Sequence, residues 1–332
     1  MRERRTKGKE IWASVVIRSQ VVPIRRLLAA LGLILAATTS VAQECKPSRW
    51  GADDEIGNIN LITPQSILKA VELIRTGKVY SLGITIDSST PAFAPRGLSL
   101  QVVQPGQQES ARPLQNVTYN DDVFQGWFGI GSQLDGLGHL GVDGMYYNCN
   151  HARDFAQVGG LTKLGIDKVP PMVGRGIVLD MAAHAGKTHL DAGEYFSVAD
   201  VKAVEQKQGT PVRKGDVVLF HTGWTDAKLA TDPQAWVSGA PGQSEEVAGY
   251  LAGKEVVAVG ADTWGLDVVP PQHPDRPYQG HVILLKQNGI YVLETMNTGP
   301  LVADGAYEFL FVLGQAKVRG AVQMFINPIA IR

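Results

Sequence analysis

The sequence has few cysteines, and the motifs that it lacks narrow the chemistry open to it. Only Cys45 and Cys149 occur among 332 residues, and no C-x-x-C motif is present, which argues against a zinc finger or a thioredoxin-like redox centre. No G-x-S-x-G sequence occurs either, so the nucleophile elbow of the α/β-hydrolases is absent. The formal net charge is -1, and no basic cluster follows residue 26. A nucleic-acid-binding surface is therefore not expected.

The N-terminus has the three parts of a secretory signal. Residues 1–26 are basic, residues 27–42 are apolar and rich in small side chains, and a small-residue cleavage site ends at Ala42, before Gln43. This order is typical of a signal peptide, and the apolar run is too short for a comfortable membrane span. We therefore predict a signal peptide over residues 1–42, a periplasmic or secreted protein, and no stable membrane anchor after cleavage. An uncleaved anchor is the alternative.

The rest of the chain, residues 43–332, is interpreted as one domain with more strands than helices. Export would permit a disulfide between Cys45 and Cys149, but their spacing fits two free thiols nearly as well. Short β-branched runs bounded by turn residues predict strands at 78–86, 98–103, 176–182, 215–224, 256–262, 281–294 and 323–331. Capped helical periods lie at 63–77, 197–209 and 244–254. Because strands and helices alternate only partly, we expect an α/β fold with a barrel-like mixed sheet and flanking helices.

A glycine-rich stretch, IGSQLDGLGHLGVDG at residues 130–144, contains the G-x-G-x-x-G pattern of dinucleotide-binding loops. That loop needs a helix directly after it, but the residues that follow have no helical period, so we interpret the match as accidental. The same stretch places Asp135 four residues before His139. A carboxylate and an imidazole suit Zn²⁺ or Mn²⁺. Taken alone, however, such a pair in a turn is better explained by an aspartate that caps the backbone.

A second pair of ligand-type residues lies near the C-terminus. His281 and Glu294 stand at the two ends of a predicted hairpin that turns at Asn288 and Gly289. A hairpin returns its second strand beside the first, so the two side chains can converge on one site. A surface pair on an edge strand fits the same spacing.

Two predicted strands are followed by polar residues, where binding loops commonly lie. His221 closes the strand within residues 215–224, and Asp262 and Asp267 follow the next one. We interpret His221 as a structural histidine rather than a ligand.

Six segments in a fixed order resemble the metal-dependent cyclase-family hydrolases that include bacterial kynurenine formamidase and isatin hydrolase. The resemblance runs from about Trp50 to the C-terminus, through WGADDEIGNINLITP, GSQLDGLGH, GRGIVLDMA, GDVVLFHTGW, GADTWGLD and HVILLKQNGIYVLETMNTGPL. It implies a swivelling β/β/α fold with a barrel-like sheet, and a homodimer or homotetramer with site loops near the subunit contacts.

The family signature, close to H-x-G-T-H-x-D-x-P-x-H, matches this chain only in part. Its aspartate falls on Asp135 and its last histidine on His139, but its two metal-binding histidines fall on Gly129 and Gln133. A branch of the family with GTQ-x-D-G-x-x-H in place of the signature is similar to this chain. A glutamine carbonyl is a weaker ligand than an imidazole, so the identity of the metal is open. His281 and Glu294 match the ligand pair of the dizinc members.

The resemblance implies hydrolysis of an amide or lactone-like C–N or C–O bond in a small-molecule substrate. A Zn²⁺ or Mn²⁺ ion would be held by Asp135, Gln133, His281 and Glu294, and would supply an activated water as nucleophile. His139 would act as the general base. Four neighbouring aromatic residues could form the wall of a pocket for a planar substrate, although core packing explains them equally well: Trp127, Phe128, Tyr146 and Tyr147.

Two alternatives stay open at this stage. A non-catalytic periplasmic binding protein could keep the pocket and discard the ion, which would account for the missing signature histidines. A ring-closing cyclase or dehydratase would use the same ion and base in the opposite direction. Because the chain is predicted to be exported, we do not expect it to be the kynurenine formamidase of cytoplasmic tryptophan catabolism.

Overall fold

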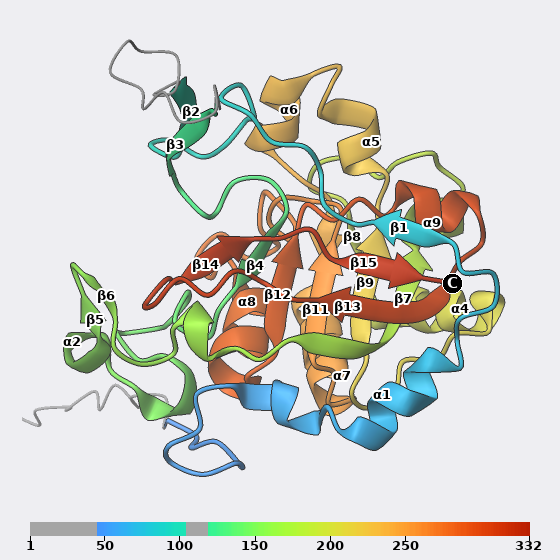
Figure 1. Ribbon diagram of the computed structural model, residues 1–332. Coiled ribbons are helices and arrows are strands. Elements are labelled where there is room, and N and C mark those ends of the chain that lie inside the picture. The colour runs from blue at the N-terminus through green and yellow to red at the C-terminus, as the bar shows by residue number, and fades with distance from the viewer. Residues whose placement is uncertain (1–44, 104–118) are drawn as a thin grey trace, which may run out of the picture. The chain divides into compact units, whose positions relative to one another are not determined.

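The computed structural model describes residues 45–103 and 119–332, which are built around one nine-stranded mixed sheet (Figure 1). The predicted signal peptide lies outside the described residues. In spatial order the strands are β1 (Val79–Ser81), β15 (Ile329–Ile331), β13 (Glu308–Leu313), β7 (Met172–Asp180), β9 (Val217–His221), β11 (Ala258–Ala261), β12 (Tyr291–Glu294), β4 (Gln133–Asp135) and β14 (Gln323–Phe325). The four strands from β7 to β12 are parallel, and the flanking ones pair antiparallel. The sheet curls into a half-barrel with flanking helices, which confirms the predicted α/β class.

The remaining elements surround this sheet. Three two-stranded ribbons are formed by β2 (Leu98–Val103) with β3 (Asp121–Gly126), β5 (Ala156–Gln157) with β6 (Gly160–Leu161), and β8 (Tyr195–Phe196) with β10 (Gly242–Gln243). The α-helices are α1 (Pro64–Val71), α2 (Ala152–Phe155), α3 (Met181–His184), α4 (Val198–Gln208), α5 (Trp224–Lys228), α6 (Pro233–Ser238), α7 (Glu245–Gly253), α8 (Gln279–His281) and α9 (Gly299–Ala303). Short 3-10 turns are η1 (Gly57–Leu61), η3 (Tyr147–Cys149) and η4 (Ile166–Lys168), and η5 (Val282–Gln287) is π-helical. Within these residues, no helix combines the length and apolar character that a membrane span needs.

The two best-marked helix starts occur where the capping residues predict them. Helix α4 begins after Ser197, which forms a capping box with Asp200, and it ends at Gly209 in the left-handed conformation. Helix α1 begins at the predicted cap and proline but ends at Val71, short of the predicted residue 77. After Val71 the backbone turns instead. The amides of residues 73 and 74 donate to carbonyls only three residues back, and those of residues 76 and 77 donate to the carbonyl of Arg332.

The predicted strand over residues 281–287 is wrong, because these residues are helical. Helix α8 runs directly into η5, and the amide of Gly289 donates to the carbonyl of Leu285 before β12 begins. A short apolar run fits a buried strand and a buried helix equally well, which explains the error. The run at 323–331 also divides into β14 and β15, since Pro328 has no amide to give to a sheet.

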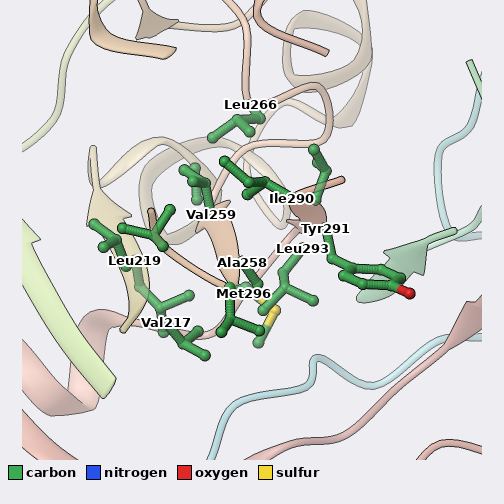
Figure 2. Close-up of a cluster of buried hydrophobic side chains, with 14 of the residues drawn as sticks. Val217, Leu219, Ala258, Val259, Leu266, Ile290, Tyr291, Leu293 and Met296 are labelled. Carbon is green, nitrogen blue, oxygen red and sulfur yellow. The ribbon is translucent and has the colours of Figure 1, made fainter. Parts of the chain in front are cut away.

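The parallel strands lie within the hydrophobic core. Val217, Val259 and Leu293 on β9, β11 and β12 are at most 2% exposed and pack in the cluster of Figure 2. Strands buried on both faces are expected to be continuously apolar, and β9 and β11 are buried at every position. This packing fixes the carboxyl end of β12, where Glu294 lies.

A disulfide joins Cys45 to Cys149, with the two Cα atoms 5.5 Å apart. It ties the first described residue to η3, just after the glycine-rich loop. Of the two alternatives that the spacing left open, the structure therefore has the disulfide.

Candidate metal centre

Strand β4 places the polar side chains of the site on one face of the sheet. Gln133 and Asp135 are two residues apart, so they share a face. The register sets Glu294 of β12 opposite Gln133, and Gln323 of β14 opposite Asp135. Two carboxylates and two amides therefore meet near the carboxyl end of β12.

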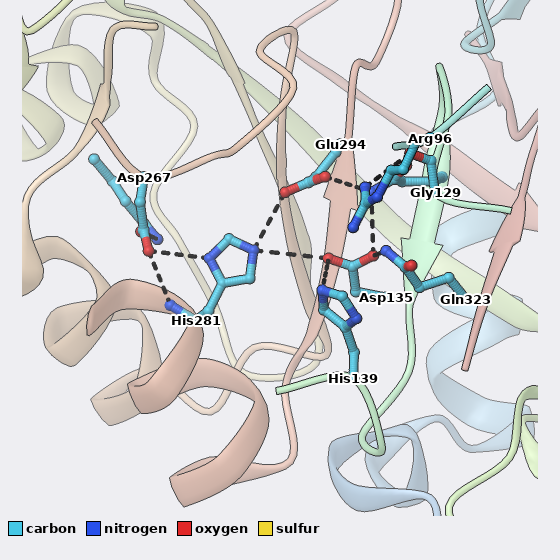
Figure 3. A network of polar contacts seen from close by, with 10 residues as sticks. Arg96, Gly129, Asp135, His139, Asp267, His281, Glu294 and Gln323 are labelled. Carbon is cyan, nitrogen blue, oxygen red and sulfur yellow. Dashed lines mark hydrogen bonds and ion pairs between the residues drawn. The ribbon is translucent and has the colours of Figure 1, made fainter. Parts of the chain in front are cut away.

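His281 reaches the same place from α8. Its Nε2 atom lies 3.2 Å from Oε1 of Glu294 and 3.7 Å from Oδ2 of Asp135 (Figure 3). One ligand-type atom from each of the three residues lies within 4.8 Å of the other two, and all three residues are buried. The convergence expected from the sequence is thus present, although a helix and not a hairpin strand carries His281.

These three residues fit a divalent cation. Oδ2 of Asp135 is fully buried and accepts no hydrogen bond from the residues that the structure describes, which is costly for a carboxylate oxygen unless a cation faces it. One imidazole and two carboxylates are borderline and hard ligands of the kind that Zn²⁺ and Mn²⁺ accept. Asp135, His281 and Glu294 would hold such an ion.

Burial and mutual charge shift the pKa values of all three residues. Burial, followed by the charge of Asp135, raises the pKa of Glu294 to about 7. Burial opposes ionisation of Asp135 too, but His139 and His281 hold its pKa below the usual value. Burial also disfavours the charged form of His281, yet the neighbouring acids raise its pKa well above the usual range. The acids therefore need a positive partner, which is a protonated His281 or a metal ion.

His139 stands beside the three residues without joining them. Its Nε2 atom lies 3.8 Å from Oδ2 of Asp135, and its side chain lines a pocket that opens onto the site. Burial lowers the pKa of His139, and the charge of Asp135 offsets part of that effect. A neutral imidazole next to a cation site can accept a proton near neutral pH.

The two positions that depart from the family signature have other contacts. Nε2 of Gln133 donates to Oε2 of Glu294 at 2.5 Å and lies 3.4 Å from Oδ1 of Asp135. At Gly129 a Cβ atom would lie 2.7 Å from Nη1 of Arg96, which donates to the Gly129 carbonyl at 2.9 Å. A guanidinium therefore occupies the space into which a side chain at position 129 would extend.

The pocket above the site measures about 510 Å³, and Gln133, His139, His281 and Glu294 all line it.

Of the aromatic residues proposed from the sequence, Trp127 lines this pocket. Phe128 packs edge-on against Phe325, and Tyr146 packs against Phe155. Tyr147 is buried and bonds to Asp54 and Ser48. The pocket gains further aromatic walls that the sequence did not single out, from Phe93, Trp264 and Tyr278.

Two polar contacts of the site and one charged residue of its pocket were not predicted. Asp267 accepts from Nδ1 of His281 at 3.0 Å, Nε2 of Gln323 donates to Oδ1 of Asp135 at 2.7 Å, and Arg96 lines the pocket. For these three residues, the only sequence signal was the position of Asp267 just after the strand that is now β11. His221, by contrast, bonds to the hydroxyl of Thr298 at 2.8 Å and is not among the residues that line this pocket.

Comparison with known proteins gives a consistent picture. The family model described as "Putative cyclase" matches residues 80–268, more than half of the chain. The crystal structure of a novel cyclase is 28% identical, with a TM-score of 0.77, and the match covers 86% of this chain and 98% of that one.

Two isatin hydrolases share the fold at lower identity. Isatin hydrolase A from Ralstonia solanacearum is 20% identical over 81% of this chain and 97% of that one, with a TM-score of 0.58. Isatin hydrolase A from Labrenzia aggregata, bound to benzyl benzoate, is 17% identical over 79% and 94%, with a TM-score of 0.55. No curated protein matches the sequence.

Proposed function

Because this chain belongs to the cyclase family, we propose that it is a metal-dependent hydrolase of an amide or lactone-like C–N or C–O bond. One observation carries the proposal. Asp135, His281 and Glu294 converge in a buried cluster at the base of a pocket of about 510 Å³, with His139 on its wall. A cation site, a base and room for an organic substrate are the three components that such a reaction needs.

Each residue has a definite part in this proposal. A bound divalent ion would activate water and polarise the scissile carbonyl. Nε2 of His139, neutral near pH 7 because burial lowers its pKa, would accept the proton of the attacking water and return it to the leaving group. Gln133, which the sequence also suggested as a ligand, donates to Glu294 and would orient that carboxylate toward the site.

The pocket favours a planar substrate. Trp127, Trp264 and Tyr278 line it together with Arg96, and aromatic walls bind flat rings through offset or edge-on contacts. Among the described residues that line the pocket, Arg96 is the only permanent cation. We therefore place a carbonyl or carboxylate of the substrate beside Arg96. Isatin, which the fold relatives are named for, belongs in the first substrate panel.

Metal analysis of the mature protein, from Gln43, tests the proposal first. Mass spectrometry before and after chelation should find Zn²⁺ or Mn²⁺ bound at a fixed ratio to protein, and turnover of a panel of aryl amides, lactams and lactones should depend on that ion. A protein that neither retains nor rebinds metal would contradict the hydrolase and favour a binding protein. Turnover only in the ring-closing direction would favour the cyclase alternative.

We further propose that the chain functions outside the cytoplasm, after removal of residues 1–42. The disulfide between Cys45 and Cys149 supports this, because such bonds persist in oxidising compartments. Cell fractionation with N-terminal sequencing tests it, and an uncleaved cytoplasmic chain would overturn it.

A second copy of the chain is the proposed partner for the β2–β3 ribbon. Leu100, Val102 and Phe124, which the strand register places on one face of this ribbon, are 60%, 59% and 42% exposed. A two-stranded ribbon is marginal by itself, and contiguous exposed apolar surface is typical of an interface. Light scattering should give a dimer or tetramer, and a strictly monomeric chain would contradict this part.

A further inference from the structure

Behind His281 lies a further buried carboxylate, which is held in turn by an amide. Oδ2 of Asp267 accepts from Nδ1 of His281 at 3.0 Å and from the backbone amide of the same residue at 3.1 Å (Figure 3). The other oxygen, Oδ1, accepts from Nε2 of Gln243 at 3.0 Å. The two bonds from His281 to one oxygen fix the rotation of the imidazole, and the bond from Gln243 fixes the carboxylate.

The three groups come from separate elements. His281 belongs to α8, Asp267 lies in the loop after β11, and Gln243 lies in β10, a strand outside the nine-stranded sheet. The backbone amide of Gln243 also donates to the Leu266 carbonyl at 3.1 Å. All three side chains are buried, with residue exposures of 3%, 6% and 1% in the order named. A ribbon that supplies no ligand therefore braces one side of the metal centre.

Packing and polarity allow only one orientation of the Gln243 amide. Its Oε1 atom is buried and accepts no hydrogen bond from any donor within residues 45–103 and 119–332, while the nitrogen bonds to Asp267. A flipped amide would set its oxygen against a carboxylate oxygen. Gly280 closes the space on the other side, because a Cβ atom there would overlap Oδ1 of Asp267 and lie 2.6 Å from Nε2 of Gln243.

We propose that Gln243 is a positioning residue for the metal centre, which acts through Asp267 to keep Nε2 of His281 directed at Asp135 and Glu294. The inference rests on the metal-binding role proposed above. An imidazole that donates from Nδ1 presents the lone pair of Nε2 to a cation, and outer groups that fix this orientation strengthen binding. Without Gln243 the Asp267 carboxylate can rotate, and the ring that it holds rotates with it.

Metal affinity of the chelator-stripped protein tests this directly, by titration with Zn²⁺ and with Mn²⁺ against a chromophoric chelator. Gln243→Leu keeps most of the volume and removes the donor, so we expect affinity to fall about tenfold, the low end of the effect of outer-shell changes. Asp267→Ala should cost about 100-fold, the upper end. Gln315→Leu is the matched control, because Gln315 is also buried and donates through Nε2 to the Val169 carbonyl. Like that of Gln243, its Oε1 atom has no hydrogen-bond partner in the described part of the chain.

A pair of exchanged residues separates positioning from general packing. Gln243→Glu sets two carboxylates against each other and should weaken metal binding. Adding Asp267→Asn to the Gln243→Glu variant restores both hydrogen bonds, because the asparagine can accept from His281 and donate to the new glutamate. The negative charge is then at position 243 instead of position 267. The double variant should therefore bind metal more tightly than Gln243→Glu alone. Additive losses of metal affinity would instead overturn the relay, by which we mean the hydrogen-bonded chain from Gln243 through Asp267 to His281.

The outcomes distinguish the relay from the proposed function. If the wild-type protein binds metal and Gln243→Leu binds it equally well, the relay is wrong and the hydrolase proposal is unaffected. If the wild-type protein binds no metal, the hydrolase proposal fails, and the relay is decided on metal-free protein labelled with ¹⁵N-histidine. There the Nδ1 proton of His281 should exchange slowly in the wild-type protein and in Gln315→Leu, and faster in Gln243→Leu. Equal exchange in all three would overturn the relay.

Discussion

Nε2 of His281 lies 3.7 Å from Oδ2 of Asp135, and that oxygen accepts no hydrogen bond from any donor in the described part of the chain. Asp135 is on β4 at one side of the site, and His281 is on α8 at the other. A cation between them would satisfy the oxygen and the imidazole together, and the predictions below follow from this arrangement.

Asp135→Asn should abolish stoichiometric metal binding. The change keeps the shape of the side chain and removes the charge of the buried oxygen, so affinity should fall more than about 100-fold, beyond the effect of an outer-shell substitution. Metal content after gel filtration measures this. Asp143→Asn, in the same glycine-rich loop but outside the cluster, is the control and should retain the metal. An Asp135→Asn protein with full metal content would remove Asp135 from the ligand set.

His139→Ala should lower kcat by about 10²- to 10⁴-fold, the usual contribution of a general acid–base residue. Metal content should stay near the wild-type value, because Nε2 of His139 lies 3.8 Å from Asp135 and is not part of the ligand cluster. Steady-state kinetics on any substrate from the panel, with metal analysis of the same sample, check the two parts. Turnover that survives the substitution would show that another group acts as base.

Metal affinity should rise with pH. In the metal-free protein the pKa of Glu294 is raised to about 7, first by burial and then by Asp135, so below pH 7 an incoming ion must displace a proton. Each displaced proton makes the apparent association constant rise about tenfold per pH unit below that pKa, and this contribution levels off above it. The pKa of His281 is raised as well, which extends the rise to higher pH. Titrations across this range check the slope, and Glu294→Gln should lack the step near pH 7.

Gly280→Ala should reduce the free energy of unfolding by about 1–3 kcal/mol, the usual effect of overpacking a tight site. The added Cβ atom would overlap Oδ1 of Asp267. Gly249→Ala is the matched control, because Gly249 lies within α7 and a Cβ atom there meets nothing within 4 Å. The control should be neutral or stabilising by up to about 1 kcal/mol, since alanine favours a helix. Urea denaturation measures both variants, and equal stabilities would contradict the close packing at Gly280.

Removal of the disulfide by Cys45→Ser with Cys149→Ser should destabilise the protein by roughly 2–5 kcal/mol. The bond joins residues 104 apart in sequence, so its loss returns a long loop to the unfolded chain. Denaturation of the variant and of the wild-type protein, each with and without reductant, gives the value. Reductant should lower the stability of the wild-type protein only. Equal stability of the variant and the wild-type protein in the absence of reductant would contradict the prediction.

The sequence predicted the elements that local signals define, and the structure supplied the contacts that depend on tertiary packing. The capping box at Ser197 and the glycine at 209 mark a helix by themselves. The apolar run after His281 carries no such mark, so a strand was predicted where a helix forms. The partner of that histidine, Asp267, follows β11 as any loop residue would. Its contact with His281 depends on how α8 packs, which no short pattern records.

The register of β4 also constrains the order in which this protein can mature. Asp135 emerges early during synthesis, but its neighbours on either side, β12 and β14, come from the last part of the chain. A nascent chain that ends before residue 294 therefore has no assembled cluster with which to capture an ion. Any metal loading must therefore follow synthesis of Glu294, the last of the three cluster residues along the chain.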